Sequence, residues 1–314
     1  MRPYTDSHDL APAADGSGGD TAKLRERALE DGYLYISGLI PPDELKRVRT
    51  AITGVLAKHG WLRPGSDPLD ALTDHAPVIE GRDEFWPVFE DVQSLEVFHT
   101  LAHHPRILGV FQALFGEQPL PHARNIFRAI FPNAVAHSTP AHQDYVHIQG
   151  TTDSWTCWMP LGDAPAELGG GLPIAAGSHK RGLYPVRHSA GAGSVGIPED
   201  KLEDEWHQGT MKAGDALMFN SHTVHKGLPN TTPDRMRLSV DFRYQPVSHP
   251  VTRESMAPHF ARKPWEEYYK GWGEGSAKVR NYWSGLDLKL VDFDPAVYKY
   301  EDAEPAAGAV AGKM

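Results

Sequence analysis

The residues whose types and spacing most suggest chemistry are His142 and Asp144, in the stretch Ala141–Tyr145 (AHQDY) of this 314-residue chain. Residues two apart in a strand project from the same face, so a strand here predicts an imidazole beside a carboxylate. Such a pair supplies two ligands of a metal site. A third ligand is available further on, where His222 and His225 have opposite parity, so only one of them faces the metal if their strand is unbroken.

The chain has seventeen histidines and one cysteine, which restricts the kinds of metal site that it can build. Disulfide scaffolds, zinc ribbons and iron–sulfur sites need several cysteines, and the chain has only Cys157, so these sites are excluded. Any metal must therefore be held by nitrogen and oxygen ligands. Two histidines and one carboxylate leave coordination positions open, as in non-haem Fe(II) oxygenases. A His-x-Asp tripeptide alone is weak evidence, because it also occurs by chance or as an ordinary hydrogen-bonded pair.

The segment Asp234–Tyr244 alternates strictly between two kinds of residue. Every even position from 236 to 244 is apolar, whereas the odd positions are Arg, Arg, Ser, Asp and Arg. This pattern predicts a strand with one apolar and one polar face. On the polar face, the guanidinium of Arg237 and the hydroxyl of Ser239 form a pair suited to binding a carboxylate. A solvent-facing edge strand explains the same pattern.

Helices and strands must position these residues. Apolar spacing predicts helices over 22–30, 42–59 and 105–115, with a short strand at 33–36. Runs of aromatic and β-branched residues predict further strands over 124–131, 143–148, 155–161, 216–219 and 237–244. We expect a mainly β protein with flanking helices: a double-stranded β-helix (jelly-roll, cupin-like) barrel with the N-terminal helices packed on the outside.

The composition also predicts domain limits and excludes some partners. Residues 1–20 and 301–314 lack large apolar residues at regular spacing, so we expect disorder there and a single domain over 21–300. The net charge of -10 and the lack of a basic run argue against nucleic acid as a partner. No apolar run indicates a signal peptide or a membrane span, so we expect a cytoplasmic protein without a membrane partner. The oligomeric state is left open.

Four segments in order resemble the phytanoyl-CoA dioxygenase family of Fe(II)- and 2-oxoglutarate-dependent oxygenases, and the resemblance runs from Ala22 to Tyr244. The segments are His142-Gln143-Asp144, the tryptophan-bearing run 156–161, the Gly-rich turn and GSHK signature within 170–180, and the run from Gly214 to His225 followed by Pro229-Asn230.

This resemblance implies a cofactor set and its ligands. Fe(II) would be held by His142, Asp144 and His225, with His222 left as a packing residue. 2-Oxoglutarate would place its far carboxylate on Arg237, which forms an Arg-x-Ser pair with Ser239 as in other 2-oxoglutarate enzymes. Arg235 is the alternative, because the two arginines lie on either side of the family's usual spacing from the distal histidine. O2 would be the oxidant. The further residues that could contact the co-substrate are Trp158, Ser239, Thr139 and Gln149, of which the last two could equally be ordinary polar residues.

The implied function is hydroxylation or another oxidation of a C–H bond in a small-molecule substrate, with release of succinate and CO2. Related halogenases carry a small residue in place of Asp144, so its retention favours hydroxylation. No cluster of Lys and Arg suggests a site for coenzyme A, which favours a free small molecule. The alternatives are a cupin-like metal-dependent hydrolase or isomerase, and a non-catalytic carboxylate-binding barrel. The aromatic residues between 265 and 283 are expected to pack on the core, or else to form a lid or a dimer surface.

Overall fold

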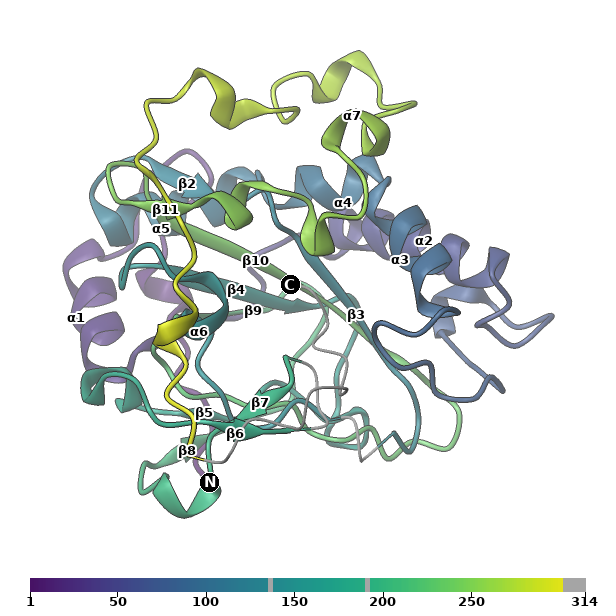
Figure 1. Cartoon of the computed structure of the whole chain (residues 1–314), viewed down its shortest axis with the longest axis horizontal. Coiled ribbons are helices and arrows are strands. Elements are labelled where there is room, and N and C mark those ends of the chain that lie inside the picture. Colours follow the sequence, from purple (N-terminus) through teal and green to yellow (C-terminus); the bar gives the residue numbers. More distant parts are fainter. Residues whose placement is uncertain (135–137, 190–192, 302–314) are drawn as a thin grey trace.

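The computed structural model describes residues 1–134, 138–189 and 193–301 (Figure 1). The expected disordered tail therefore lies outside the described residues, apart from Glu301. Among the described residues, no helix is both long and apolar enough to cross a membrane.

A six-stranded antiparallel sheet forms the centre of the molecule. Its strands, in spatial order, are β1 (Tyr33–Ile36), β9 (Ala216–Asn220), β4 (Trp155–Pro160), β10 (Arg237–Pro246) and β2 (Pro119–Pro121), and β3 (Ile126–Ile130) also pairs with β10. The register of β10 places Arg243 opposite Thr156, Asp241 opposite Trp158 and Ser239 opposite Arg128. Directly paired residues lie on the same face, so these side chains share one inward-facing surface, which is polar except for Trp158.

A second layer of short strands faces this sheet in Figure 1. Strand β5 (Ile174–Ala175) pairs with β8 (Trp206–His207), and β6 (Arg187–His188) pairs with β7 (Val195–Gly196). His225 extends this layer, because it forms isolated bridges with Ile174 on one side and with His142 on the other. Elsewhere, β11 (Val251–Thr252) runs parallel to β12 (Leu290–Val291).

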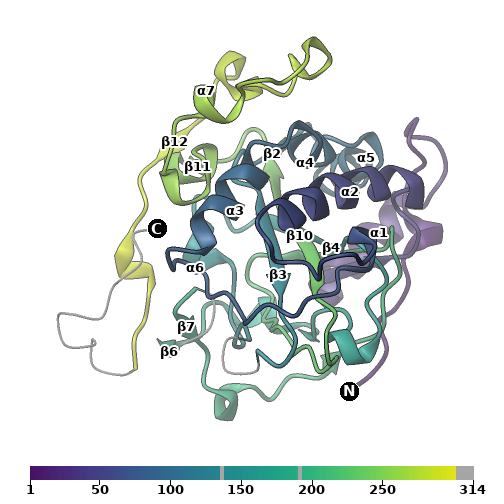
Figure 2. The same cartoon turned by 90° about the vertical axis from the view of Figure 1, so that its right-hand side faces the viewer.

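Five helices cover the outer face of the sheet (Figure 2). They are α1 (Thr21–Asp31), α2 (Pro42–Lys58), α3 (Phe85–Gln93), α4 (Glu96–Leu101) and α5 (Pro105–Phe115). Asp20 caps α1 by accepting a hydrogen bond from the Lys23 amide, and Gly32 ends it with a left-handed φ of 74°. Pro42 begins α2, where its missing N–H has no helical partner to lose.

The main core lies between these helices and the sheet. It contains the even-numbered residues of β10 from Leu238 to Tyr244 and the apolar stripe of α2, which includes Ile52. Each fully buried side chain of this size stabilises the fold by about 1.5–3 kcal/mol relative to an exposed one. All ten residues of β10 are buried, so the solvent-facing edge strand considered above is wrong, and the polar face of β10 points into the interior.

Two segments differ from the sequence-based expectations. The strand predicted over 143–148 is wrong, because Tyr145–Ile148 form the short helix α6. The N-terminal segment, for which the composition predicts disorder, follows a defined path. The Tyr4 hydroxyl donates to the Leu172 carbonyl at 2.6 Å, and its ring lies 5.2 Å from that of Tyr35. The Ser7 amide also donates to the Tyr35 carbonyl at 2.7 Å, so several contacts anchor the segment.

The C-terminal part has little regular structure. Its aromatic residues pack on the protein, and Trp265 and Tyr268 of helix α7 (Trp265–Tyr268) share a core cluster with Leu120 and Val251. The C-terminal segment (residues 290–301) then runs across α6 in Figure 1. Among the described residues, 3₁₀ turns are formed by His8–Leu10, Pro68–Asp70, Ala166–Leu168, Ser178–Arg181, Glu199–Lys201, Arg253–Met256, His259–Ala261, Glu274–Ser276, Tyr282–Gly285 and Pro295–Val297.

Candidate functional site

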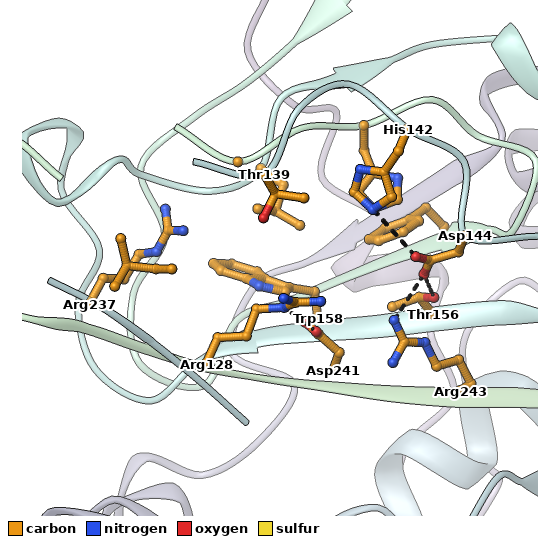
Figure 3. A pocket seen from close by; sticks show the side chains of 14 residues that line it. Arg128, Thr139, His142, Asp144, Thr156, Trp158, Arg237, Asp241 and Arg243 are labelled. Atoms are coloured by element: carbon orange, nitrogen blue, oxygen red, sulfur yellow. Dashed lines mark hydrogen bonds and ion pairs between the residues drawn. The ribbon is translucent and has the colours of Figure 1, made fainter. Parts of the chain in front are cut away.

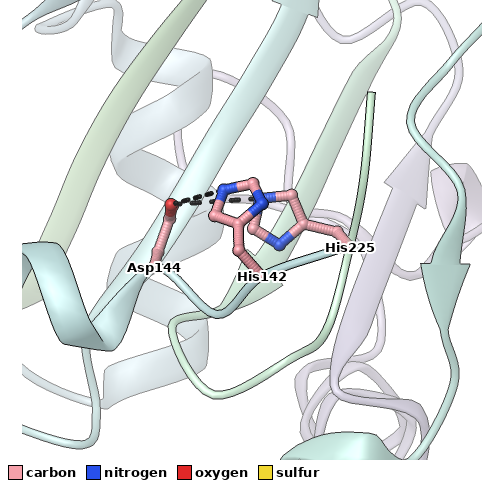
Figure 4. A group of neighbouring side chains, drawn as sticks. All are labelled: His142, Asp144 and His225. Atoms are coloured by element: carbon pink, nitrogen blue, oxygen red, sulfur yellow. Dashed lines mark ion pairs between the residues drawn. The ribbon is translucent and has the colours of Figure 1, made fainter. Parts of the chain in front are cut away.

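Three buried side chains, His142, Asp144 and His225, converge between the two layers (Figure 4). Asp144 Oδ1 lies 3.6 Å from Nε2 of His142 and 3.9 Å from Nε2 of His225. One potential ligand atom from each residue lies within 4.8 Å of the other two. Among the described residues, this is the one group of three or more His, Cys, Asp or Glu side chains with such spacing.

The backbone holds the two imidazoles together. The His142 amide donates to the His225 carbonyl at 2.9 Å, and the His225 amide donates to the His142 carbonyl at 3.0 Å. Side chains of directly paired residues lie on the same face, and the two ring centroids are 4.1 Å apart. His225 follows β9 after a turn, so the parity argument, which assumed an unbroken strand, does not apply to it.

Hydrogen bonds determine which nitrogen of each imidazole carries the proton. Nδ1 of His142 lies 2.9 Å from the Pro140 carbonyl, and Nδ1 of His225 lies 3.1 Å from the Thr223 carbonyl. A carbonyl can only accept, so each Nδ1 is protonated and each Nε2 keeps a free lone pair. Burial lowers the pKa of His225 to about 3, which keeps this ring neutral.

Asp144 reaches the site from the start of α6, with φ -63° and ψ -26°, and not from a strand. Its Oδ2 accepts hydrogen bonds from Thr156 Oγ1 at 2.5 Å and from the Arg243 guanidinium at 3.3 Å, which leaves Oδ1 facing the histidines. Burial raises the pKa of Asp144, but the positive charge of Arg243 outweighs burial and holds that pKa well below its usual range.

These donors fit a divalent iron. Two neutral imidazole nitrogens and one carboxylate oxygen are the protein ligands of mononuclear non-haem Fe(II) sites. Carbonyl hydrogen bonds to the remote imidazole nitrogens, and further bonds to the remote carboxylate oxygen, are typical of metal ligands. The geometry alone is also compatible with other divalent metals.

The three side chains line one end of a pocket with an empty volume of about 410 Å³. Figure 3 shows Arg237 at the other end, with Trp158 and Thr139 between it and His142. The side chains of Leu172 and Phe219 also line the pocket. The pocket therefore joins a potential metal centre to a buried cation.

Arg237 is the best candidate for binding an anion here. It is 5% exposed, and within the described structure its Nε and Nη1 have no hydrogen-bond partner. Burial lowers the pKa of Arg237 to about 10, so it stays charged at neutral pH. A buried charge without a partner is costly, and a carboxylate matches its fork of N–H donors. Arg235, the alternative, is exposed and does not line this pocket; it lines a neighbouring hollow, which Arg49 and Arg237 also line.

The glycine run before the predicted GSHK signature has a steric role at this end of the pocket. Gly169 has a φ of 88°, and a Cβ added to it would lie 2.6 Å from Nη1 of Arg237. A larger residue would therefore force the guanidinium to move. This supports the sequence-based reading of the run as a turn.

The other candidate residues have different positions. Trp158 and Thr139 line the pocket, and the Trp158 ring lies 5.9 Å from the Arg237 guanidinium carbon. Ser239 is buried between Arg237 and Asp241 on β10, and its hydroxyl has no hydrogen-bond partner in the described structure. Gln149 instead directs its amide to the backbone of Asp294 in the C-terminal segment, with hydrogen bonds of 2.9 and 2.8 Å.

His222 also lies apart from the site, as expected. Its ring packs against that of Tyr145 with a centroid distance of 4.4 Å.

Sequence reasoning missed three charged residues in the pocket. Arg243 and Asp241 lie on the predicted polar face of β10, so the alternation already carried their signal. Arg128 lies on β3, where its Nε donates to Asp241 at 2.7 Å. No local pattern marked Arg128, because its role depends on the register between β3 and β10.

Comparisons with known proteins agree with this geometry. The family model of phytanoyl-CoA dioxygenase (PhyH) matches residues 28–239. The chain is 31% identical to 1-deoxypentalenic acid 11-beta-hydroxylase of Streptomyces arenae over 289 residues, which cover 87% of this chain and 94% of that protein. The protein of the same name from Streptomyces exfoliatus is 32% identical over 267 residues, which cover 78% and 86% of the two chains.

A solved structure supports the fold. The epimerase SnoN, in complex with Fe3+, alpha ketoglutarate and nogalamycin RO, superposes with a TM-score of 0.53 at 22% identity, covering 73% of this chain and 84% of that one. The family match and the two hydroxylases show that the chain belongs to the phytanoyl-CoA dioxygenase family, whose members are Fe(II)- and 2-oxoglutarate-dependent oxygenases.

Proposed function

We propose that this enzyme hydroxylates a C–H bond of a free small molecule, with Fe(II) held by His142, Asp144 and His225. The far carboxylate of 2-oxoglutarate binds Arg237. One observation carries this assignment: three potential metal ligands line the same pocket as a buried guanidinium, two of whose nitrogens have no hydrogen-bond partner among the described residues. We also infer that the two layers form a double-stranded β-helix, which the six-stranded sheet and the bridges of His225 support.

The residues of the chain act mainly by positioning and by excluding water. When bound, Fe(II) and 2-oxoglutarate supply the oxidation of an unactivated C–H bond by dioxygen, with release of succinate and CO2. Thr156 and Arg243 fix Asp144 through Oδ2, so that Oδ1 faces the metal position. Trp158, packed beside Arg237, forms an apolar wall that orients the co-substrate and keeps water from its charged end.

Hydroxylation is proposed because the two relatives named above are hydroxylases and because Asp144 is present to complete the ligand set. The family match and these relatives do not favour a hydrolase, an isomerase or a non-catalytic barrel.

A spectroscopic experiment tests the ligand assignment. Under anaerobic conditions, the protein with Fe(II) and 2-oxoglutarate should show a weak visible charge-transfer band. His225→Ala should remove the band, whereas the matched control His222→Ala should retain it, because His222 packs on Tyr145 outside the site. Loss of the band in the His222 variant with retention in the His225 variant would show that the assignment is wrong. In air, the wild-type protein should slowly form succinate even without a prime substrate.

A further inference from the structure

A second and larger hollow adjoins the pocket that holds the triad. Its empty volume is about 1080 Å³, and it lies between residues 77–80, helix α3 and strand β3. Arg128, Ile130 and Thr139 line both hollows. Because these three residues are shared, the two spaces are neighbours, and a molecule in the larger hollow can reach toward the triad.

The walls of this larger hollow are mainly apolar. Helix α3 contributes Phe85, Val88 and Phe89, and strand β3 contributes Phe127. Sites for small organic ligands are typically apolar with a few polar groups that fix orientation. These walls match a compact hydrocarbon skeleton and offer little to a sugar or a nucleotide.

Arg128 supplies a cation at the boundary between the two hollows. Among the described contacts, its side chain makes one hydrogen bond, from Nε to Asp241 at 2.7 Å. This bond fixes the plane of the guanidinium and leaves its terminal nitrogens available. The other charged residue of the hollow is Glu80, which lies on an exposed loop within electrostatic range of Arg128. A planar guanidinium recognises a carboxylate through two parallel hydrogen bonds.

We propose that the larger hollow binds the prime substrate, and that this substrate is a hydrocarbon acid whose carboxylate pairs with Arg128. The inference rests on the proposed function and deepens it. The apolar walls hold the carbon skeleton. The pairing with Arg128 fixes the end of the skeleton that lies nearest the triad, so one region of the molecule is presented for oxidation.

Two rigid probes of equal shape and different charge test the proposal. 1-Adamantanecarboxylate and 1-adamantanemethanol are titrated by calorimetry into the anaerobic enzyme loaded with Fe(II) and saturating 2-oxoglutarate. The wild-type protein should bind the carboxylate at least about tenfold more tightly than the alcohol, because a hydrogen bond to a charged group adds at least that factor.

The variant Arg128→Gln tests the role of the charge while keeping a donor for Asp241. It should weaken binding of the carboxylate by roughly 10- to 100-fold and that of the alcohol by less than about threefold. The matched control Arg82→Gln removes an exposed arginine from the neighbouring loop and should change neither affinity. Equal loss for both probes in Arg128→Gln, or no binding of either probe to the wild-type protein at millimolar concentration, would overturn the proposal.

A second variant tests the location independently of Arg128. Ile79 lines the hollow from a half-buried loop position, so Ile79→Trp fills the space with little effect on folding. It should weaken binding of both probes at least about tenfold while leaving the affinity for 2-oxoglutarate unchanged, and unchanged probe binding would exclude this hollow. The two proposals fail separately: absence of the Fe(II)–2-oxoglutarate band refutes the proposed function, whereas a normal band without probe binding refutes only this inference.

Discussion

Replacing Arg237 by methionine should change stability and co-substrate binding in opposite directions. Without the co-substrate, the guanidinium is buried, and two of its three nitrogens have no hydrogen-bond partner in the described structure. Methionine fills a similar volume without a charge. The free protein should therefore become more stable, and 2-oxoglutarate should bind more weakly.

The size of the first effect follows from the pKa of Arg237. Burial lowers this pKa from 12.5 to about 10. At about 1.4 kcal/mol per pKa unit, the charged form costs the folded state about 3 kcal/mol. Recovery of even about 1 kcal/mol in Arg237→Met raises Tm by roughly 2 °C for a domain of this size. The second effect is the loss of charge-assisted hydrogen bonds of about 1.5–3 kcal/mol, which weakens the Kd for 2-oxoglutarate by roughly 10- to 150-fold.

The assay is thermal unfolding with Mn(II), which replaces Fe(II) without supporting turnover. Tm is measured without 2-oxoglutarate and over a range of 2-oxoglutarate concentrations. The proteins compared are the wild type, Arg237→Met and the control variant Arg235→Met. The wild-type Tm should rise with 2-oxoglutarate, because a ligand that binds only the folded state stabilises it. Arg237→Met should start at a higher Tm and need a much higher concentration for the same rise.

Arg235→Met is the matched control, because Arg235 is exposed and does not line the pocket that holds the triad. It should respond to 2-oxoglutarate as the wild-type protein does. A lower starting Tm in Arg237→Met combined with an unchanged response to 2-oxoglutarate would refute the reasoning. Loss of the response in Arg235→Met alone would move the carboxylate site to Arg235.

Three further changes have defined outcomes. Thr156→Val removes the hydroxyl that donates to Asp144, so Fe(II) affinity measured by competition with a chelator should fall about 10- to 100-fold, and an unchanged affinity would contradict this role. Gln149→Ala removes both hydrogen bonds to Asp294, and hydrogen exchange in the C-terminal segment should accelerate while exchange in α2 stays the same. Burial lowers the pKa of His99 to about 4. As the pH falls from about 6.5 to 4, this imidazole is therefore protonated in the unfolded state but not in the folded state, so the free energy of unfolding decreases. His99→Gln should flatten this dependence in urea titrations at several pH values, whereas an unchanged slope would assign the loss to other groups.

The sequence predicted the regular elements well where apolar periodicity was strong. Strand β1 has the predicted bounds, and α2 and β10 agree within one or two residues at each end. The alternation in β10 also separated its two faces, because every second side chain of a buried strand must enter the same environment. The sequence alone could not show that the polar face lines an internal pocket, since that depends on the layer opposite.

The His-x-Asp argument selected two residues that the structure does bring together with His225, but it expected the wrong local structure for them. A strand was expected, yet Asp144 starts α6, and the Tyr145 amide is held by the Ser221 carbonyl, a contact that is distant in sequence. Helices α3 and α4 were missed because each is short, and tertiary packing can stabilise such segments beyond their own periodicity. Arg128 was missed because its environment is created by pairing with β10.

The reciprocal hydrogen bonds between the backbones of His142 and His225 affect which metals the protein can accept. These bonds set the separation of the two imidazoles before any ion arrives, so loading needs no rearrangement of the main chain. A preformed pocket of nitrogen and oxygen donors offers no steric barrier to cobalt, nickel or copper, which bind such donors more strongly than Fe(II) does. Correct loading must therefore depend on which ions are available where the protein is made, and preparations from different growth media should differ in metal content while sharing one fold.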